Sequence, residues 1–191
     1  RIREKLARLY PQHDTDALLA RFLALVDSPA APPADSLALS ERDVMLITYG
    51  DQVHARDEAP LATLRRFLAQ TLAGAVNCVH ILPFYPYTSD DGFSVVDYEQ
   101  VNPALGDWSH IDALKDDYRL MFDAVFNHIS ASSAWFRAFL RDEAPFTDYF
   151  VTVPPDTDLS QVVRPRTLPL LTPFETSSGT KHVWTTFSAD Q

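Results

Sequence analysis

The sequence has 191 residues, of which 46% are hydrophobic and 22% are charged. This composition is typical of a folded globular protein, and it excludes a disordered tail, a collagen-like repeat and a small disulfide-bonded scaffold. The 16 basic and 26 acidic residues give a net charge of -10, which argues against nucleic acid or an anionic membrane surface as the main partner.

The first part of the chain predicts helix. Residues 1–26 read as two helical pieces, and Asp14 is the expected N-cap of the second. Apolar side chains then recur on one helical face, at Leu18, Leu19, Phe22, Leu23 and Val26. A proline-containing linker follows over residues 27–40. We therefore place an N-terminal helical extension and linker at residues 1–40.

Three short apolar runs in the next part predict buried strands. They span residues 44–50, 78–84 and 120–126. Two helical segments separate them, at residues 60–72, with Pro60 in the first turn, and at 109–118, with Ser109 as N-cap and Asp112 as its capping-box partner. Strands alternating with helices indicate a parallel α/β sheet. Three strands do not close a barrel, so either the sheet is open or most of a barrel lies outside this chain.

The last part changes character. Ser132 or Ser133 is the expected N-cap of a helix that runs through Trp135 and Leu140. Prolines cluster beyond residue 144, and the periodicity fades. Residues 144–191 therefore predict a loop-rich insertion with one or two strands, which leaves residues 41–143 as the main α/β part.

Composition and ends also constrain the cellular setting. The single cysteine, Cys78, excludes an internal disulfide, and its apolar surroundings in sequence indicate a buried core thiol. No run reaches the roughly 18 apolar residues of a membrane span, and we find no signal-peptide pattern. These features predict a cytoplasmic protein. Because the chain starts at Arg1 without methionine and stops at Gln191 in polar sequence, we expect it to be processed, trimmed or a fragment of a longer chain.

Polar residues follow each predicted strand, where ligands bind in parallel α/β folds. Asp51 and Gln52 follow the first strand, and solvation of the loop explains them as well as function does. Asp123 lies inside the third predicted strand, and we expect its carboxylate to accept hydrogen bonds from loop backbone. His128 stands at the end of that strand beside Asn127, a position that favours a functional role over a structural one.

The sequence lacks the motifs of several common catalytic and binding sites. The six histidines show no H-x-x-x-H or H-E-x-x-H spacing, which argues against zinc. The sequence has no G-x-S-x-G, no P-loop and no G-x-G-x-x-G, so nothing supports a serine hydrolase or a glycine-rich nucleotide site.

Two motifs carry a family resemblance. "DAVFNH", residues 123–128, is similar to the first conserved region of glycoside hydrolase family 13, the α-amylase family, and "DDGFSVVDYEQVNPALGDW", beginning at Asp90, is similar to the loop after that family's second barrel strand. The sucrose phosphorylase subfamily matches best, through "LITYGDQ", "HILPFYPYTSDDGF", "RPRTLPLL" and "VWTTFSADQ". The sequence of this loop resembles that of the subgroup of enzymes that act on sucrose 6'-phosphate, glucosylglycerate or glucosylglycerol.

The resemblance implies a fold and a reaction. The fold would be the first three strands of a (β/α)8 barrel with an inserted B domain at residues 144–191. The reaction would be retaining transfer of an α-glucosyl group from a sucrose-like α-glucoside to phosphate, which gives α-glucose 1-phosphate. The implied partners are an α-glucoside, phosphate and the rest of the barrel. The acceptor stays open between fructose, fructose 6-phosphate, glycerate and glycerol.

The resemblance also implies roles for residues that bind glucose. Asp90 matches the carboxylate that hydrogen-bonds distal hydroxyls of the sugar, and Phe93 matches an aromatic platform against the sugar face. His128 matches the imidazole that contacts the 6-hydroxyl. Phe187 and Gln191 match a pair beside the glucose pocket at the end of the B domain.

Other matching residues would act on anions or support the site. We favour Arg166 as the contact for phosphate or an anionic acceptor, and we hold Arg164 as structural. Asp123 and Asn127 would support the site from behind. Calcium is common in amylases beside the asparagine of this region, but sucrose phosphorylases generally lack it, so we expect no metal at Asn127 and no cofactor.

The family's nucleophile, acid/base and third acid lie on or after the fourth, fifth and seventh strands, and no carboxylate here matches their motifs. Two rival functions remain, an amylase-like or sucrose-hydrolysing enzyme of the same superfamily and a non-catalytic module that binds a sugar or a partner. A longer reading frame that supplies the three acids would exclude the module.

We therefore predict that the 191 residues alone have no phosphorylase activity, because they carry part of a sugar pocket and none of the catalytic acids. Purified protein of this length, incubated with phosphate and α-glucosides, should release no glucose 1-phosphate. Detectable turnover by pure material would contradict the prediction.

Overall fold

The computed structural model describes residues 1–28, 39–163 and 169–191, and it divides the chain into two compact units, Arg1–Glu41 and Arg42–Gln191. Arg164 and Arg166, for which we predict a structural role and anion binding respectively, lie outside the described residues. None of the helices in the described ranges is both long enough and apolar enough to cross a membrane.

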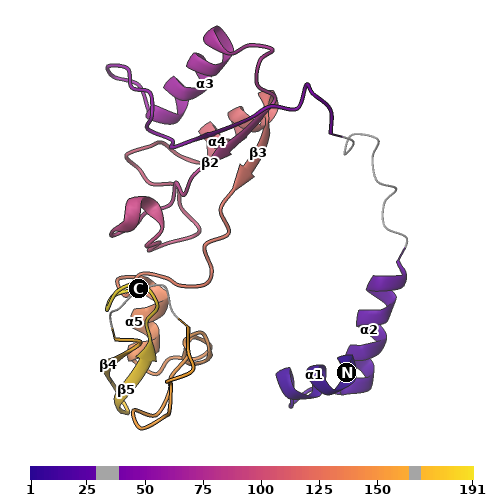
Figure 1. Ribbon diagram of the computed structural model, residues 1–191, viewed down its shortest axis with the longest axis vertical. Helices are drawn as coiled ribbons and strands as arrows, with labels where there is room; N and C mark the ends of the chain where they lie inside the picture. The colour runs from indigo at the N-terminus through magenta and orange to yellow at the C-terminus, as the bar shows by residue number, and fades with distance from the viewer. Residues whose placement is uncertain (29–38, 164–168) are drawn as a thin grey trace. The chain divides into compact units, whose positions relative to one another are not determined.

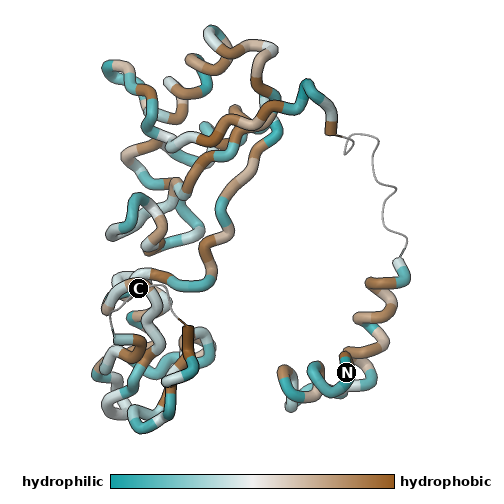
Figure 2. The backbone as a smooth tube through the Cα atoms, viewed as in Figure 1, coloured by the Kyte–Doolittle hydropathy of each residue, from teal (hydrophilic) through white to brown (hydrophobic). Residues whose placement is uncertain are grey.

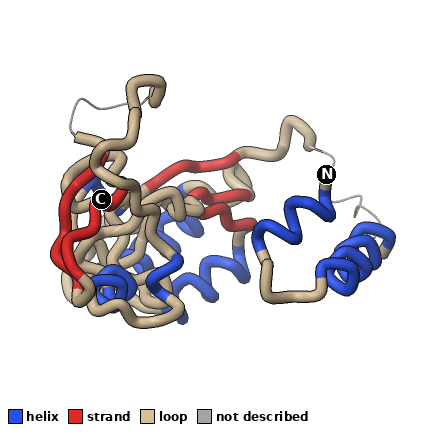
Figure 3. The backbone as a smooth tube through the Cα atoms, turned by 90° about the horizontal axis from the view of Figure 1, so that it is seen from below, coloured by secondary structure: helices blue, strands red, loops and turns tan. Residues whose placement is uncertain are grey.

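The first unit is a pair of helices, α1 (Ile2–Leu9) and α2 (Thr15–Asp27), joined by a short turn (Figure 3). The Asp14 carboxylate accepts hydrogen bonds from the backbone N–H groups of Asp16 and Ala17, which confirms the predicted N-cap. Arg3 of α1 donates to both carboxylate oxygens of Asp16, at 2.8 and 3.2 Å. Neither helix contains a buried residue, and Leu6, Leu18 and Leu19 are only partly buried, so this unit has no closed core of its own.

The second unit begins with a three-stranded parallel sheet. Its strands are β1 (Met45–Thr48), β2 (Cys78–Ile81) and β3 (Arg119–Phe122), in the order β1-β2-β3, and they alternate with helices α3 (Pro60–Thr71) and α4 (Trp108–Asp117) (Figure 1). The predicted order of elements is confirmed. The strands are shorter than the predicted runs, because the chain leaves the sheet where the prolines and polar loop residues begin.

One face of this sheet packs against helices. Side chains from β2 and from both helices form a buried core, whose members include Val79, Ile81, Leu64, Leu68 and Leu114. Burying a leucine side chain contributes about 1.5–3 kcal/mol. Pro60 occupies the first turn of α3, as predicted. The helix α4 is capped by Asp107, not Ser109, and its capping box pairs Asp107 with His110, so the predicted cap was wrong by two residues.

The opposite face of the sheet is apolar and uncovered in this structure. Figure 2 shows that the residues along the strands are hydrophobic. On this face, Met45, Ile47 and Met121 are 46, 60 and 46% exposed. The register aligns Cys78 with Met45, and the thiol is partly exposed. The predictions of strands buried on both faces and of a core thiol were therefore wrong here.

The last part of the chain is built around α5 (Ala134–Leu140) and the antiparallel hairpin of β4 (Leu171–Thr176) and β5 (Gly179–Trp184), with a short 3-10 turn, η3 (Phe146–Asp148). Ser133 caps α5, because its hydroxyl accepts from the Phe136 N–H at 3.1 Å. Aromatic rings fill the space between helix and hairpin, notably Phe136, Phe150 and Phe174. The predicted limit between the barrel part and the B domain, at residues 143 and 144, stays a prediction.

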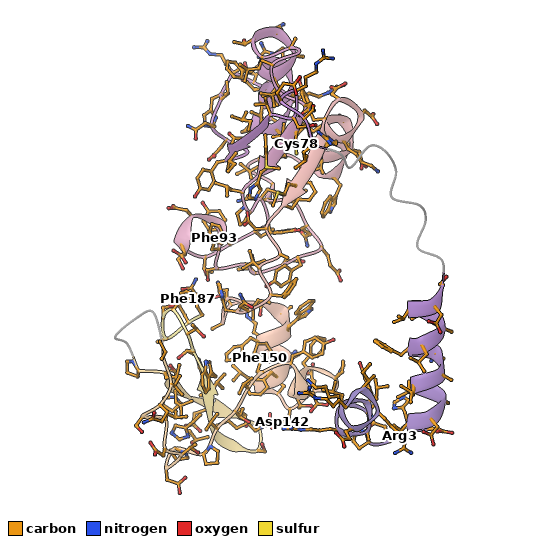
Figure 4. All side chains as sticks on the ribbon, turned by 45° about the vertical axis from the view of Figure 1, so that its right-hand side comes forward. Arg3, Cys78, Phe93, Asp142, Phe150 and Phe187 are labelled. Atoms are coloured by element: carbon orange, nitrogen blue, oxygen red, sulfur yellow. The ribbon has the colours of Figure 1, made fainter. Side chains whose placement is uncertain are left out.

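An ion pair fastens the hairpin to the end of α5. Lys181 of β5 donates to the Asp142 carboxylate, and its ammonium lies 5.3 Å from the centre of the Phe139 ring. Figure 4 labels Asp142 in this part of the chain. The hydrogen bond from Lys181, assisted by its charge, holds the pKa of Asp142 below its ordinary value.

We predict that Asp142→Asn destabilises the protein in a pH-dependent way. Since the folded-state pKa of Asp142 is lowered, the ion pair stabilises the fold above the ordinary aspartate range and loses this contribution as the pH falls through the lowered pKa. Urea unfolding should show a less stable variant at pH 7, with a difference that shrinks below about pH 4. Asp148→Asn, at an exposed residue, serves as the control. A difference between Asp142→Asn and wild type that is independent of pH would contradict the prediction.

Candidate functional site

The loop after β2 carries the first part of the site in a sharp left-handed turn, η2 (Asp90–Gly92). Asp90, Asp91 and Gly92 have φ values of 60, 49 and 100°. A Cβ on Gly92 would lie 2.6 Å from the carbonyl oxygen of Pro83, so only glycine fits this position. Two non-glycine residues in this region cost of order 1–3 kcal/mol each, and such strain persists only where the surrounding structure imposes it.

This turn presents the carboxylate of Asp90 to solvent. Asp90 is exposed, and within the described residues its carboxylate makes no hydrogen bond. The backbone carbonyl of Asp90 accepts from the Phe93 N–H at 2.9 Å, which closes the turn and places the partly buried Phe93 next to it. The turn therefore offers an acceptor and an aromatic side chain from neighbouring positions.

His128 contacts both the loop after β2 and the C-terminal segment. Its Nε2 lies 2.9 Å from the carbonyl oxygen of Phe93, and its ring centroid lies 4.5 Å from that of Phe187. Since a carbonyl can only accept, Nε2 carries the proton of this hydrogen bond, and Nδ1 of the neutral imidazole is an acceptor. That Nδ1 is buried without a partner among the described residues. His128 can thus accept a hydrogen bond from a ligand hydroxyl.

The segment 186–191 supplies the third part. Its backbone is tied to the loop after β3, because the Ala131 N–H donates to the carbonyl of Asp190 at 2.8 Å. Gln191 is 9% exposed. Its Oε1 lies 3.0 Å from the Ser188 hydroxyl oxygen, while its Nε2 is buried with no partner in the described part of the chain. Gln191 therefore holds an unused donor.

A cavity of about 280 Å³ opens between the loop after β3, α5 and β5, near the lower end of the range for small-molecule sites. His128, Gln191 and Asn127 line it, together with the aromatic side chains of Trp135 and Trp184. Asp90, Phe93 and Phe187 do not line this cavity. Figure 4 labels Phe93 on the loop after β2 and Phe187 on the C-terminal segment. Of the predicted residues, Phe93 and Phe187 contact His128, Gln191 lines the same cavity as His128, and Asp90 lies in the turn next to Phe93.

Asp123 has a different partner from the one predicted. It lies one residue beyond β3 and not inside the strand, and its Oδ2 lies 2.9 Å from Nε2 of His80 on β2. An imidazole, not loop backbone, thus pairs with this carboxylate. Sequence reasoning missed His80. The alternation of β2 carried the signal, because the neighbouring Val79 and Ile81 are buried on the opposite face.

Tyr98 is a second residue that sequence reasoning missed. Its hydroxyl lies within hydrogen-bond distance of the carbonyl oxygens of Val125 and His128, 3.1 Å from the latter. Burial raises the pKa of Tyr98 to about 12, so the phenol stays protonated and donates at neutral pH. Its ring contacts Trp135, with centroids 5.5 Å apart. Tyr98 therefore fixes the backbone of the loop that carries His128.

The arrangement is suited to recognising a ligand with several hydroxyl groups. It combines an exposed carboxylate, an unused acceptor, an unused donor and aromatic rings, which together match the polar and apolar faces of a sugar. The carboxylates of Asp123 and Asp190 are engaged, with His80 and the Ser188 hydroxyl respectively. Within residues 1–28, 39–163 and 169–191, no group of three or more His, Cys, Asp or Glu is placed to hold a metal ion.

Comparison with known proteins identifies the family of this chain. The model of the family described as "Alpha amylase, catalytic domain" matches residues 73–186. A glucosylglycerate phosphorylase of Allomeiothermus silvanus is 60% identical over 152 residues, which cover 80% of this chain and 27% of that protein. A glucosylglycerate phosphorylase of Spirochaeta thermophila is 50% identical over 199 residues, which cover 100% of this chain and 34% of that protein.

More distant relatives share the same part of the chain. A sucrose phosphorylase of Streptococcus mutans is 30% identical over 158 residues, which cover 77% of this chain and 32% of that protein. The crystal structure of sucrose 6F-phosphate phosphorylase from Thermoanaerobacter thermosaccharolyticum superposes with a TM-score of 0.67 at 29% identity, covering 81% of this chain and 33% of that one. The chain thus spans about a third of the length of the relatives it matches.

Proposed function

Because this chain belongs to the α-amylase catalytic-domain family, with a sheet that forms part of a (β/α)8 barrel, we propose that it is the N-terminal part of a retaining α-glucoside phosphorylase. The whole enzyme would transfer a glucosyl unit from a sucrose-like α-glucoside to phosphate and release α-glucose 1-phosphate. The named relatives, which are phosphorylases, support this reading. A cytoplasmic location fits the single cysteine.

The observation that carries the proposal is the environment of His128. Its Nδ1 is a buried acceptor without a partner in the described residues, its Nε2 is held by Phe93, and the Phe187 ring lies against it. A buried acceptor without a partner is costly, and a ligand hydroxyl relieves that cost. We assign His128, Asp90 and Gln191 to hydrogen bonds with the glucosyl hydroxyls, and Phe93 and Phe187 to its apolar faces.

The reaction divides into two displacements in which electrons and protons balance. A carboxylate attacks C1 of the glucosyl unit, while an acid protonates the departing glycosidic oxygen. Phosphate then gives its proton to the conjugate base of that acid and displaces the carboxylate from C1, which yields α-glucose 1-phosphate with retained configuration. We assign neither the nucleophile nor the acid/base to any residue of this chain. Its residues hold and orient the sugar, with Asp123 and Asn127 supporting the loop that bears His128.

We further propose glucosylglycerate as the donor substrate. The relatives that are 60 and 50% identical bear the name glucosylglycerate phosphorylase, whereas the sucrose phosphorylase of Streptococcus mutans is 30% identical. Glycerate carries a carboxylate that a guanidinium recognises well, and Arg166 is our candidate for that contact or for phosphate. Arg164 remains our candidate for a structural role.

The exposed apolar face of the sheet favours a whole enzyme in which the barrel has further strands. Met45, Ile47 and Met121 are exposed there, and barrels of this type fill their interior with apolar side chains. We propose that further strands of the same barrel cover this face in the whole enzyme.

The test measures glucose 1-phosphate released by the full-length protein from glucosylglycerate, with sucrose compared in parallel. We expect release that requires phosphate and a preference for glucosylglycerate. His128→Ala should lower kcat/KM about tenfold to a hundredfold, the effect of losing a hydrogen bond to a buried group. His182→Ala, on β5, is the matched control and should behave as wild type.

Three outcomes would contradict parts of the proposal. Glucose release at the same rate with and without phosphate would identify a hydrolase of the same family. Turnover of no α-glucoside would favour a sugar-binding module without catalysis. Activity with sucrose equal to that with glucosylglycerate would refute the assigned donor but keep the phosphorylase.

A further inference from the structure

The side-chain hydroxyl groups of Thr88, Ser94 and Ser130 lie together next to the turn that carries Asp90. The Thr88 Oγ1 lies 2.9 Å from the Oγ of Ser94 and 2.8 Å from the Oγ of Ser130. Ser94 and Ser130 are 0 and 1% exposed, whereas Thr88 is exposed. Ser94 comes from the loop after β2 and Ser130 from the loop after β3, so Thr88 bridges two loops that are distant in sequence.

Backbone hydrogen bonds show that this hydroxyl cluster, Thr88, Ser94 and Ser130, closes the turn at its base. The Thr88 N–H donates to the Ser94 carbonyl at 3.0 Å, and the Ser94 N–H donates to the Ser89 carbonyl at 3.2 Å. The Ser130 N–H donates to the Val95 carbonyl at 2.9 Å. The left-handed residues of the turn lie between these fastenings, which supply the constraint that a strained backbone needs.

The same cluster is connected to His128 by two short paths. Ser130 is two residues beyond His128, and Phe93, whose carbonyl accepts from His128, directly precedes Ser94. The cluster therefore ties the segment that bears Asp90 to the segment that bears His128. A change in the hydrogen bonds of the cluster would therefore alter the distance between the Asp90 and His128 side chains, although neither residue is itself substituted.

We propose that Thr88 is a positioning residue, and that the hydroxyl cluster sets Asp90 and His128 at the spacing that lets both bind one α-glucosyl group. This inference rests on the proposed function, since it takes the sugar as the shared ligand. Buried hydroxyls suit the role because each can both donate and accept and because an unmade hydrogen bond there is costly.

The exposed position of Thr88 allows a matched pair of variants that should both fold. Thr88→Val removes the hydroxyl at nearly constant shape, and Thr88→Ser keeps it. In the full-length protein, Thr88→Val should raise the KM for glucosylglycerate and for glucose 1-phosphate about tenfold, the equivalent of one lost hydrogen bond. The KM for phosphate should stay within about twofold, and Thr88→Ser should restore wild-type values.

A merely structural role would give a different pattern. It would lower Tm and the active fraction, so kcat would fall while both KM values stayed unchanged, and that result would overturn the proposal. Equal kinetics in Thr88→Val and wild type would overturn it as well.

Calorimetric binding of D-glucose separates this inference from the proposed function. If the wild-type protein shows no phosphorolysis, the proposed function fails, but a glucose Kd that is about tenfold weaker in Thr88→Val than in wild type and Thr88→Ser would still support the cluster. The same Kd in all three proteins, or no glucose binding by wild type, would refute it.

Discussion

The hydrogen bond between Nε2 of His128 and the carbonyl oxygen of Phe93 joins the two loops on which the site depends. The loop after β2 is strained, and the loop after β3 has little regular structure of its own, so neither loop is expected to hold its conformation alone. The bond also decides the chemistry of the imidazole. Because Nε2 donates to a carbonyl, Nδ1 is left as an acceptor, and the structure buries it without a partner among the described residues.

The parallel sheet explains why these loops meet. β2 and β3 are neighbours with carboxyl ends at the same edge, so the segments that follow them leave the sheet side by side. The Tyr98 hydroxyl and the hydroxyl cluster then fasten the two segments before and after His128. Each fastening uses a neutral hydrogen bond in a buried or half-buried place, where leaving a partner unsatisfied costs about 1–3 kcal/mol. The rigidity of the site thus comes from many modest interactions between two loops.

Sequence patterns were sufficient to predict the sheet, because short apolar runs between helices indicate parallel strands, and local capping residues such as Asp14 and Ser133 act within one turn. They were insufficient where the deciding partner is distant in sequence. His80 pairs with Asp123 across 43 residues, and Thr88 meets Ser130 across 42. The predicted N-cap of α4 was wrong for another reason. Asp107 and Ser109 are both suitable N-cap residues, and only the backbone conformation distinguishes them. The residues proposed to bind the sugar came from the family resemblance, because physical patterns alone left them open.

A crystal structure of the full-length protein with D-glucose bound would test the central claim most directly. We expect one glucose with hydroxyl groups within hydrogen-bond distance of both the Asp90 carboxylate and Nδ1 of His128, while the His128–Phe93 and Thr88–Ser130 hydrogen bonds persist. A glucose that contacts neither side chain, or a bound state in which the two loops have separated, would contradict it.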